Sequence, residues 1–338
     1  MIFSKIIKLL KIVLFILIFI FLWIKYDQYS TQLQLLLLLN ENTTCSFDNI
    51  VACQSSKIRH RTFLYIIWGG AGFGSEINQL LLAFAYSIST KRHFLIDSQQ
   101  WNYGNFNHYF NISSTNYYFQ SNRQFLVENN TLNNEIDHLK TTRIGTQVRK
   151  FWLATRQVQS FEVKRKVAQF LWKSISKETL NFIENCQIKT FTNYIGIHIR
   201  KGDKLKSEAP SVSLEQHIKS IENIFDKTKT IQNIFVASDD LTVIKQFRHL
   251  KPIWNFFLIN YNNYQDINRT GHFQSKFNHL SLERKLFETR LLMCELQMLI
   301  NSQYVSCSMY SNICRLLKIL RYQHPTTTVS LGRSWYPT

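Results

Sequence analysis

The segment that decides the fold is Tyr194–Pro210, with the sequence YIGIHIRKGDKLKSEAP. Its first six residues are rich in isoleucine and predict a buried strand of a parallel sheet. The charged residues that follow fall at the carboxyl end of this strand and in the loop after it, where open α/β sheets bind their ligands. These polar residues are His198, Arg200, Lys201, Asp203, Lys204 and Glu208.

Two interpretations of this polar cluster are open. Buried charges need partners, and a structural network of ion pairs would supply them. Alternatively, Arg200 binds a diphosphate through its forked N–H groups and Lys201 binds it through a point charge. Glu208 is then free to act as a general base.

Strands and helices alternate along the rest of the chain. A strand at 63–67, the turn WGGAGFG, a helical pattern over 77–88 and a strand at 93–97 form one unit. Ser75 stands where G-x-G-x-x-G requires its third glycine, which argues against a nicotinamide cofactor. Further helices are predicted over 161–182, 214–225, 241–249, 282–300 and 312–322, strands at 233–238 and 303–307, and long loops over 101–134.

This alternation predicts an α/β fold with parallel sheets covered on both faces. Two such units in succession predict two Rossmann-like domains that face a cleft, with boundaries at 59–185 and 186–338.

Two more motifs lie at predicted strand–helix junctions. In FVASDDLTV, one of Asp239 and Asp240 can cap the helix while the other holds Arg200 or a ligand hydroxyl. The pair is not D-x-D, so no metal-bound nucleotide is expected. In CSMYSNICR, the first turn of a helix can present N–H groups and Ser311 to phosphate oxygens, or it is a plain capped helix.

The N-terminal region predicts a membrane anchor. Lysines precede an uncharged apolar run, which gives a cytoplasmic tail at 1–11, a transmembrane span at 12–26 and a stem at 27–58. A cleaved signal peptide is the alternative, but the sequence after the run offers no small-residue cleavage site. Four N-x-S/T sequons support a lumenal body in a type II arrangement, and they begin at Asn42, Asn111, Asn129 and Asn268.

Cysteine usage and charge add two expectations. Cys45 with Cys53, and Cys307 with Cys314, are candidate disulfides, whereas Cys186 and Cys294 are expected to be buried thiols without partners. No Cys/His spacing resembles a zinc site. The net charge of +18 is spread without a dense block, which argues against nucleic-acid binding. It indicates either a solvated basic surface or attraction of an anionic ligand or a membrane face.

Together the motifs resemble the α-1,6-fucosyltransferase family, which adds core fucose to N-glycans in the Golgi. The segment HIRKGDKLKSEA matches the family pattern H-V-R-R-T-D-K-V-G-T-E-A without a gap. FVASDD, Arg290, Glu295 and CSMYSNICR extend the match, as do GFG and KRHFLIDSQQWNY upstream. The resemblance implies a GT-B-like fold and inverting, metal-independent transfer from GDP-fucose to an N-glycan or glycoprotein.

The resemblance also implies roles for residues. His198 would approach guanine, Arg200 and Lys201 the diphosphate, and Glu208 would be the base. Lys204 and Arg200 would stabilise the departing GDP, and Asp203 belongs to the same catalytic group. The remaining donor-binding residues would be Gly72, Gly74, Asp239, Asp240, Ser311 and Gln303, the last in place of an Asp that receives the guanine edge.

Several positions depart from the family pattern. Lys201 replaces an Arg, His217 replaces a Tyr, and Gln303 replaces the Asp, which makes guanine selectivity an open question. A protein O-fucosyltransferase and a non-catalytic membrane-anchored glycan or nucleotide binder are the alternative functions.

Overall fold

The computed structural model describes residues 62–67, 69–89, 93–112, 136–140, 157–191, 193–203, 212–228, 233–259, 270–321 and 327–332. They all fall in the second of the two units into which the chain divides, Ile58–Thr338. The predicted tail, membrane span and stem lie outside these residues. Within the described part of the chain, no helix is long and apolar enough to cross a membrane.

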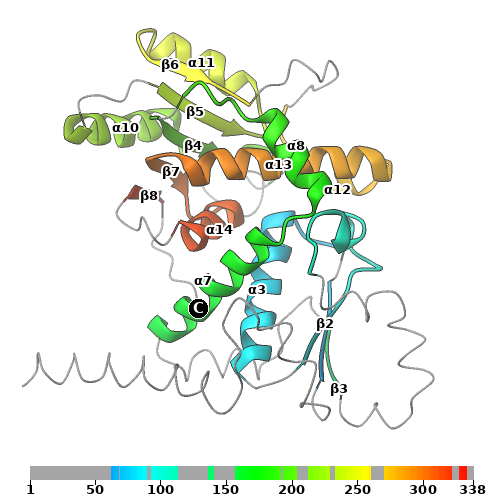
Figure 1. Ribbon diagram of the computed structural model, residues 1–338. Helices are drawn as coiled ribbons and strands as arrows, with labels where there is room; N and C mark the ends of the chain where they lie inside the picture. Colours follow the sequence, from blue (N-terminus) through cyan, green and yellow to red (C-terminus); the bar gives the residue numbers. More distant parts are fainter. Residues whose placement is uncertain are drawn as a thin grey trace, which may run out of the picture. The chain divides into compact units, whose positions relative to one another are not determined.

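The first sheet has three parallel strands in the order β2-β1-β3. Its strands are β1 (Thr62–Ile66), β2 (His93–Asp97) and β3 (Ile136–Lys140). The predicted glycine turn leads from β1 into α3 (Phe73–Ser89), which packs on β1 and β2. A short 3-10 helix, η2 (Phe106–His108), follows β2, and α7 (Gln157–Lys173) packs on α3 (Figure 1).

The second sheet has five parallel strands in the order β6-β5-β4-β7-β8. Its strands are β4 (Ile195–Ile199), β5 (Asn233–Ser238), β6 (Asn255–Phe257), β7 (Tyr304–Ser308) and β8 (Thr328–Leu331). Its helices are α10 (Leu214–Thr228), α11 (Thr242–Leu250), α12 (Gln274–Asn278), α13 (Leu282–Asn301) and α14 (Asn312–Leu320). The predicted α/β fold with parallel sheets is confirmed, while the boundary at residue 185 stays a prediction.

The helix predicted over 161–182 is two helices, α7 and α8 (Lys177–Cys186). Ser176 ends the continuous pattern because its hydroxyl accepts a hydrogen bond from Thr179 N and so caps α8. The same hydroxyl donates to the carbonyl of His108, at 2.9 Å. The break therefore joins the start of α8 to the loop after β2.

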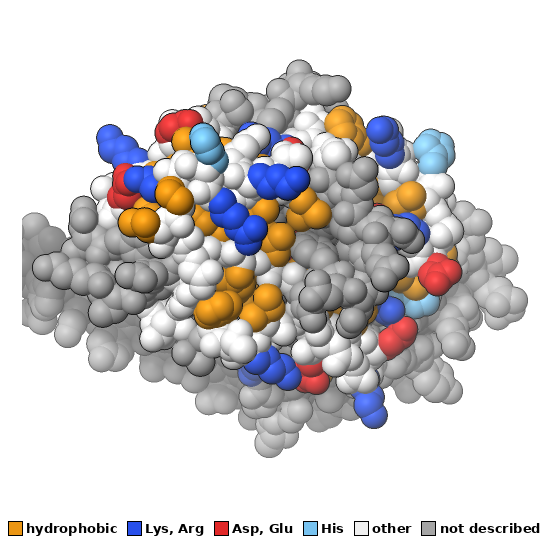
Figure 2. All heavy atoms as spheres, turned by 90° about the horizontal axis from the view of Figure 1, so that it is seen from above, with side chains coloured by type: hydrophobic (Ala, Val, Ile, Leu, Met, Phe, Trp, Pro, Cys, Tyr) orange, Lys and Arg blue, Asp and Glu red, His pale blue; other side chains and the backbone are white. Residues whose placement is uncertain are grey.

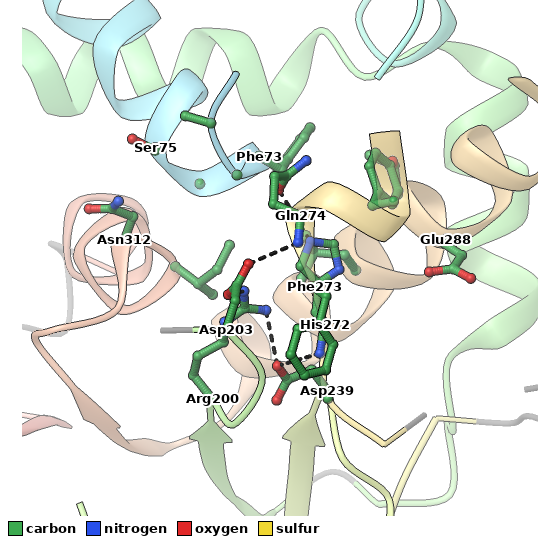
Figure 3. A pocket seen from close by; sticks show the side chains of 18 of the residues that line it. Phe73, Ser75, Arg200, Asp203, Asp239, His272, Phe273, Gln274, Glu288 and Asn312 are labelled. Atoms are coloured by element: carbon green, nitrogen blue, oxygen red, sulfur yellow. Dashed lines mark hydrogen bonds and ion pairs between the residues drawn. The ribbon is translucent and has the colours of Figure 1, made fainter. Parts of the chain in front are cut away.

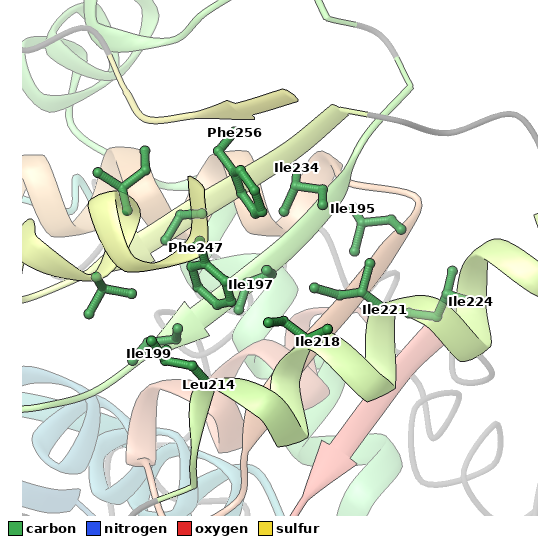
Figure 4. Close-up of a cluster of buried hydrophobic side chains, with 13 residues drawn as sticks. Ile195, Ile197, Ile199, Leu214, Ile218, Ile221, Ile224, Ile234, Phe247 and Phe256 are labelled. Carbon is green, nitrogen blue, oxygen red and sulfur yellow. The ribbon is translucent and has the colours of Figure 1, made fainter. Parts of the chain in front are cut away.

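The two faces of β4 are packed differently. On one face, isoleucines of β4 meet apolar side chains of α10 and α11, as Figure 4 shows for Ile197, Ile218 and Phe247. Full burial of each such side chain contributes about 1.5–3 kcal/mol. On the other face, α13 approaches so closely that a Cβ on Gly196 would lie 2.8 Å from Leu299 Cδ2. The end of β4 is thus held rigidly from both sides.

The surface seen in Figure 2 mixes charge types. Lys and Arg side chains lie among hydrophobic and acidic ones on this face and do not gather in a single strip. This agrees with the even spread of basic residues along the sequence.

Two disulfides lie in the described residues. Cys307 is joined to Cys314, the pair that the sequence predicts. Cys186 is joined to Cys294, so the expectation of two buried thiols is wrong: α8 packs along α13 and brings the two cysteines together. Cys45 and Cys53 lie outside the described residues.

Removing the Cys186–Cys294 disulfide is expected to destabilise the protein more than removing Cys307–Cys314. The two bonds span 108 and 7 residues, and loop-closure entropy predicts losses of about 5 and about 2.5 kcal/mol. Denaturant unfolding of the Cys186→Ala/Cys294→Ala and Cys307→Ala/Cys314→Ala variants measures both. Equal losses would show that loop closure does not dominate.

Candidate functional site

A cavity of about 580 Å³ opens beyond the carboxyl ends of β4 and β5, and Figure 3 shows both strands pointing toward it. The volume is typical of small-molecule sites. Because parallel strands end at the same edge of a sheet, the residues that follow β4 and β5 meet there. The lining also includes the glycine turn before α3, residues 270–280, one face of α13 and the start of α14.

Arg200 directly follows β4 and lies between two carboxylates. Its Nη2 is 2.9 Å from Oδ1 of Asp203, and its Nη1 is 3.0 Å from Oδ2 of Asp239. A guanidinium carries five N–H groups, so these two contacts leave donors for a ligand. The side chain is mostly buried, which strengthens its pairs relative to surface ones.

Asp239 fixes the backbone around the cavity as well as Arg200. Its Oδ1 accepts a hydrogen bond from Lys201 N at 2.7 Å, and its Oδ2 accepts one from His272 N at 3.0 Å. Its carbonyl accepts from Gly271 N at 2.8 Å. One residue therefore joins the loop after β4 to the segment before α12 (Figure 3).

Two glycines allow these loops to touch. Gly202 has φ +42°, and a Cβ there would lie 2.1 Å from the carbonyl oxygen of His272. Gly271 has φ +107°, and a Cβ there would lie 3.0 Å from the backbone of Gly202. Both positions need glycine for space and for the left-handed conformation.

Asp203 extends the network to α12. Its Oδ2 accepts a hydrogen bond from Gln274 N at 2.8 Å. Burial raises the pKa of Asp203, but the Gln274 N–H, Arg200 and His272 favour the carboxylate more strongly and hold the pKa below its usual value. The side chain is therefore ionised at neutral pH.

A buried tyrosine connects this network to the first sheet. The hydroxyl of Tyr103 donates to Oε1 of Gln274 at 3.0 Å and accepts from Phe73 N at 2.7 Å. Burial raises the pKa of Tyr103, so the hydroxyl keeps its proton. A chain of contacts thus runs from Arg200 through Asp203, Gln274 and Tyr103 to the first residue of α3.

The N-termini of α3 and α14 meet at Gly74. A Cβ there would lie 2.7 Å from Ile313 Cδ1 and 3.0 Å from Ile313 N. Asn78 Nδ2 bridges the two helices by donating to the carbonyls of Gly74 and Asn312, at 2.6 and 2.8 Å. Helix N-termini attract anions through their N–H groups and dipoles. The cavity therefore has a positive corner that the two helix N-termini form.

His198 and Glu295 lie deeper in the cavity. Side chains alternate along a strand, so His198 shares the α13-facing side of β4 with Gly196, and both it and Glu295 line the cavity. His198 is 7% exposed, and burial together with Arg200 lowers its pKa to about 3. Its Nδ1 has no hydrogen-bond partner among the described residues. A neutral imidazole with an unpaired nitrogen faces the ligand space.

A hydrogen bond to Glu76 holds the glycine turn before α3. Its Oε1 accepts a hydrogen bond from Ala71 N at 3.2 Å. The side chain is 4% exposed, and burial raises the pKa of Glu76 to about 7, against a smaller lowering by Ala71.

Most of the predicted site residues come together here. The cavity lining contains His198, Arg200, Asp203, Asp239, Ser311, Gly72 and Gly74. Ser311 caps α14 by accepting from Ile313 N at 3.3 Å. Lys204 and Glu208 lie outside the described residues, so their predicted roles stay predictions.

Three predicted donor-binding residues do not line the cavity. Asp240 lies just before α11, and its Oδ1 accepts hydrogen bonds from the N and Oγ1 of Thr242, the first residue of that helix, at 2.9 and 2.7 Å. Lys201 contributes its backbone N–H to Asp239, and its side chain is not among those that line the cavity. These two residues support the site from outside.

Gln303 is the clearest correction. It precedes β7 and is exposed, and its Nε2 donates to Asn193 Oδ1 at 2.9 Å. Asn193 lies just before β4, so this contact is at the amino ends of the strands, opposite the cavity. Gln303 is therefore not a donor-binding residue of this cavity.

The sequence analysis assigned no role to several lining residues. Arg284, Glu288 and Glu295 share one face of α13, and His272 and Gln274 come from the segment before and at the start of α12. The i, i+4, i+11 spacing on the long helix was a signal that could have found the first three. Glu295 did appear in the family pattern, but without a role.

The comparisons with known proteins agree with the motifs. Residues 163–326 match the family model described as alpha-(1,6)-fucosyltransferase N- and catalytic domains. This confirms the predicted resemblance to that family and to its class, the glycosyltransferases. An alpha-(1,6)-fucosyltransferase of Drosophila melanogaster is 23% identical over 137 residues, which are 39% of this chain and 20% of that protein. The chain thus spans about a fifth of the curated relative that it matches.

Solved fucosyltransferases are similar over more of the chain, but at lower sequence identity. NodZ alpha-1,6-fucosyltransferase, soaked with GDP-fucose, gives a TM-score of 0.48 at 15% identity, over 77% of this chain and 92% of that one. POFUT1 in complex with GDP gives a TM-score of 0.49 at 9% identity, over 81% and 99%.

Gly74→Ala is expected to lower the unfolding free energy by about 1–3 kcal/mol, because its methyl group would push α14 away from α3. Gly72→Ala is the matched control, since a Cβ there meets only Gln274 Oε1, at an ordinary 3.4 Å. Chemical denaturation measures both. If the two variants are equally stable, the close contact between the helix ends is not what requires Gly74.

Glu76 is expected to make stability depend on pH. Because its folded pKa of about 7 exceeds the unfolded value of 4.5, its contribution is fully present below pH 4.5 and is lost as pH rises through 7. The loss is about 3 kcal/mol at most. Measuring unfolding free energies from pH 4 to 8 for the wild type and Glu76→Gln isolates this term.

The unfolding free energies of the wild type and Glu76→Gln are compared because other titratable groups change stability with pH in the opposite direction. The pKa values of His198 and His217 are lowered by burial to about 3, so both reduce stability as pH falls below 6.5. They contribute equally to both proteins. A difference curve that is flat between pH 4.5 and 7 would contradict a raised pKa for Glu76.

Proposed function

We propose that this chain transfers fucose from GDP-fucose to a glycan, with a GT-B-like arrangement in which the two sheets contribute to one donor site. The observation that carries the proposal is the position of Arg200. It lies inside the segment that matches the α-1,6-fucosyltransferase model and in the cavity that the N-termini of α3 and α14 border. Since the chain spans a small part of its curated relative, the activity itself needs a direct test.

The positive corner suits a diphosphate. Gly72 and Gly74 line the cavity beside the start of α3, and Ser311 lies at the start of α14, where helix N–H groups attract phosphate oxygens. Arg200 adds forked N–H donors, which bind phosphate with geometric specificity. These groups come from both sheets, so a bound diphosphate would bridge them.

The deep part of the cavity suits a guanine base. A carboxylate offers two acceptor oxygens to the adjacent N–H donors of guanine, and Glu295 places one in the lining. The neutral His198 with its unpaired Nδ1 can exchange a hydrogen bond with the nucleotide. Guanine selectivity would then rest on Glu295 and not on Gln303.

The proposed reaction inverts the fucose C1. Glu208 takes the proton of the acceptor hydroxyl, whose oxygen forms a bond to C1 as the bond from C1 to the GDP oxygen breaks. The electron pair leaves with GDP, where Arg200 and Lys204 stabilise the charge. No group of His, Cys, Asp or Glu in the described residues is arranged to hold a metal ion, and metal-independent transfer stays part of the proposal.

We further propose that residues 12–26 anchor the protein in the Golgi membrane with residues 27–338 in the lumen. Asn111 is exposed, as a glycosylation site must be. The other sequons, at Asn42, Asn129 and Asn268, lie outside the described residues. The core GlcNAc of an N-glycan, in α-1,6 linkage, is the proposed acceptor.

A thermal-shift panel with GDP, UDP, ADP and CMP on the lumenal fragment tests the donor. GDP is expected to give the largest shift, because only guanine offers adjacent N–H donors to Glu295. Labelled GDP-fucose is then offered with a free N-glycan and, separately, with folded protein. Glu208→Gln is expected to lose transfer while keeping the GDP shift.

Each arm of this experiment separates one alternative. Transfer to folded protein alone would indicate a protein O-fucosyltransferase. GDP binding without transfer or hydrolysis would indicate a non-catalytic binder. A wild type that neither binds GDP nor hydrolyses GDP-fucose would refute both enzyme functions.

A further inference from the structure

One face of α13 runs along the cavity beyond the residues that the donor needs. Arg284, Glu288, Leu292 and Glu295 all line the cavity and follow one another at helical spacing. At a rise of about 1.5 Å per residue, Glu288 lies roughly 10 Å along the helix from Glu295. Glu295 is 5% exposed, whereas the side chains of Arg284 and Glu288 are 35% and 29% exposed. The stripe therefore leads from the depth of the cavity toward solvent.

Arg284 and Glu288 form a held pair with polar atoms to spare. Nε of Arg284 donates to Oε1 of Glu288 at 3.0 Å, and the guanidinium lies 5.2 Å from the ring centroid of Phe287. Within the described residues, both Nη atoms of Arg284 and Oε2 of Glu288 have no hydrogen-bond partner. The pair presents two donor nitrogens, which carry four N–H groups, and one acceptor oxygen in a fixed arrangement.

The charge of the pair restricts its ligand. Arg284 balances the charge of Glu288, so the pair offers no net attraction to a phosphate. Figure 3 shows Glu288 on the other side of the Arg200–Asp239 contact from Asn312, which lies at the positive corner. A neutral group that both donates and accepts hydrogen bonds satisfies Arg284 and Glu288 together. Neighbouring hydroxyl groups on a sugar ring have this property. Leu280 and Leu292 also line the cavity and can cover the apolar side of such a ring.

We propose that Arg284 and Glu288 form a sugar-binding subsite that recognises neighbouring hydroxyl groups. This inference rests on the proposed function, under which two sugars can reach the subsite. One is a residue of the acceptor glycan, and the other is the ribose of the donor. The chemistry is the same for both, and the experiment distinguishes them.

Glu288→Gln tests the subsite, because the amide keeps the shape of the side chain and loses the second acceptor oxygen and the charge. Glu283→Gln is the matched control: it is the same change on the same helix at an exposed position outside the cavity lining. Loss of one exposed i, i+4 pair changes helix stability little, so the variant is expected to fold. Calorimetry gives Kd for GDP and for 2′,3′-dideoxy-GDP, and NMR titration gives Kd for the N-glycan.

If the acceptor occupies the subsite, Glu288→Gln weakens glycan binding about ten- to a hundredfold, as for a hydrogen bond to a charged group, and leaves GDP binding unchanged. If the ribose occupies it, the variant weakens GDP binding by a similar factor but leaves 2′,3′-dideoxy-GDP binding unchanged. The Glu283→Gln control matches the wild type in both cases.

Two results would overturn the subsite. One is unchanged binding of glycan and GDP by Glu288→Gln. The other is equal weakening of GDP and 2′,3′-dideoxy-GDP, since the effect would then not involve hydroxyl groups. Failure of the wild type to bind GDP would instead contradict the proposed function, and the glycan titration would still decide whether Glu288 binds a sugar.

Discussion

The site depends on the contact between Arg200 and Asp239, which joins the ends of two neighbouring parallel strands. Each residue directly follows its strand, and the ion pair spans 3.0 Å. Asp239 is only 13% exposed, so removing Arg200 would leave a largely buried carboxylate without its main partner. Such a loss destabilises a protein more than replacing both partners with apolar residues does. Because Asp239 also accepts backbone hydrogen bonds from Lys201 and His272, this contact sets the position of two loops as well as two side chains.

The second constraint is the close approach of backbones. Gly202 lies against the backbone of His272 at a distance that no Cβ can occupy, and Gly74 lies so close to Ile313 that a Cβ there would force a shift. These contacts bring the loop after β4 close to α12 and bring α3 close to α14, so that donors from both sheets face one space. The hydrogen-bonded Tyr103 then links the two contact regions. Close backbone contacts therefore help to shape the cavity.

The sequence predicted the parts of this arrangement that local pattern controls. The strands at β2, β4, β5 and β7 have apolar runs ended by polar motifs, and topology then places Arg200 and Asp239 at one edge. The strands β3, β6 and β8 were missed. β6 and β8 are short, and IDHLK of β3 and NFF of β6 show no clear alternation, so tertiary pairing decides these strands. Gln303 was predicted both to begin a strand and to line the site. These two predictions conflict, because a residue that begins a parallel strand lies at the edge of the sheet opposite the site.

The charges that line the cavity differ from one part of it to another. Helix N-termini border one part of the cavity, where they attract negative charge, while Glu295 on α13 places a carboxylate in the deeper part. A diphosphate is attracted to the first and repelled by the second, whereas a base with N–H donors and a neutral sugar are accepted by carboxylates. The Cys186–Cys294 disulfide joins α8 to α13 next to Glu295. The helix that carries this carboxylate is therefore held covalently. The helix N-termini and this carboxylate favour one orientation of an elongated ligand with one anionic centre.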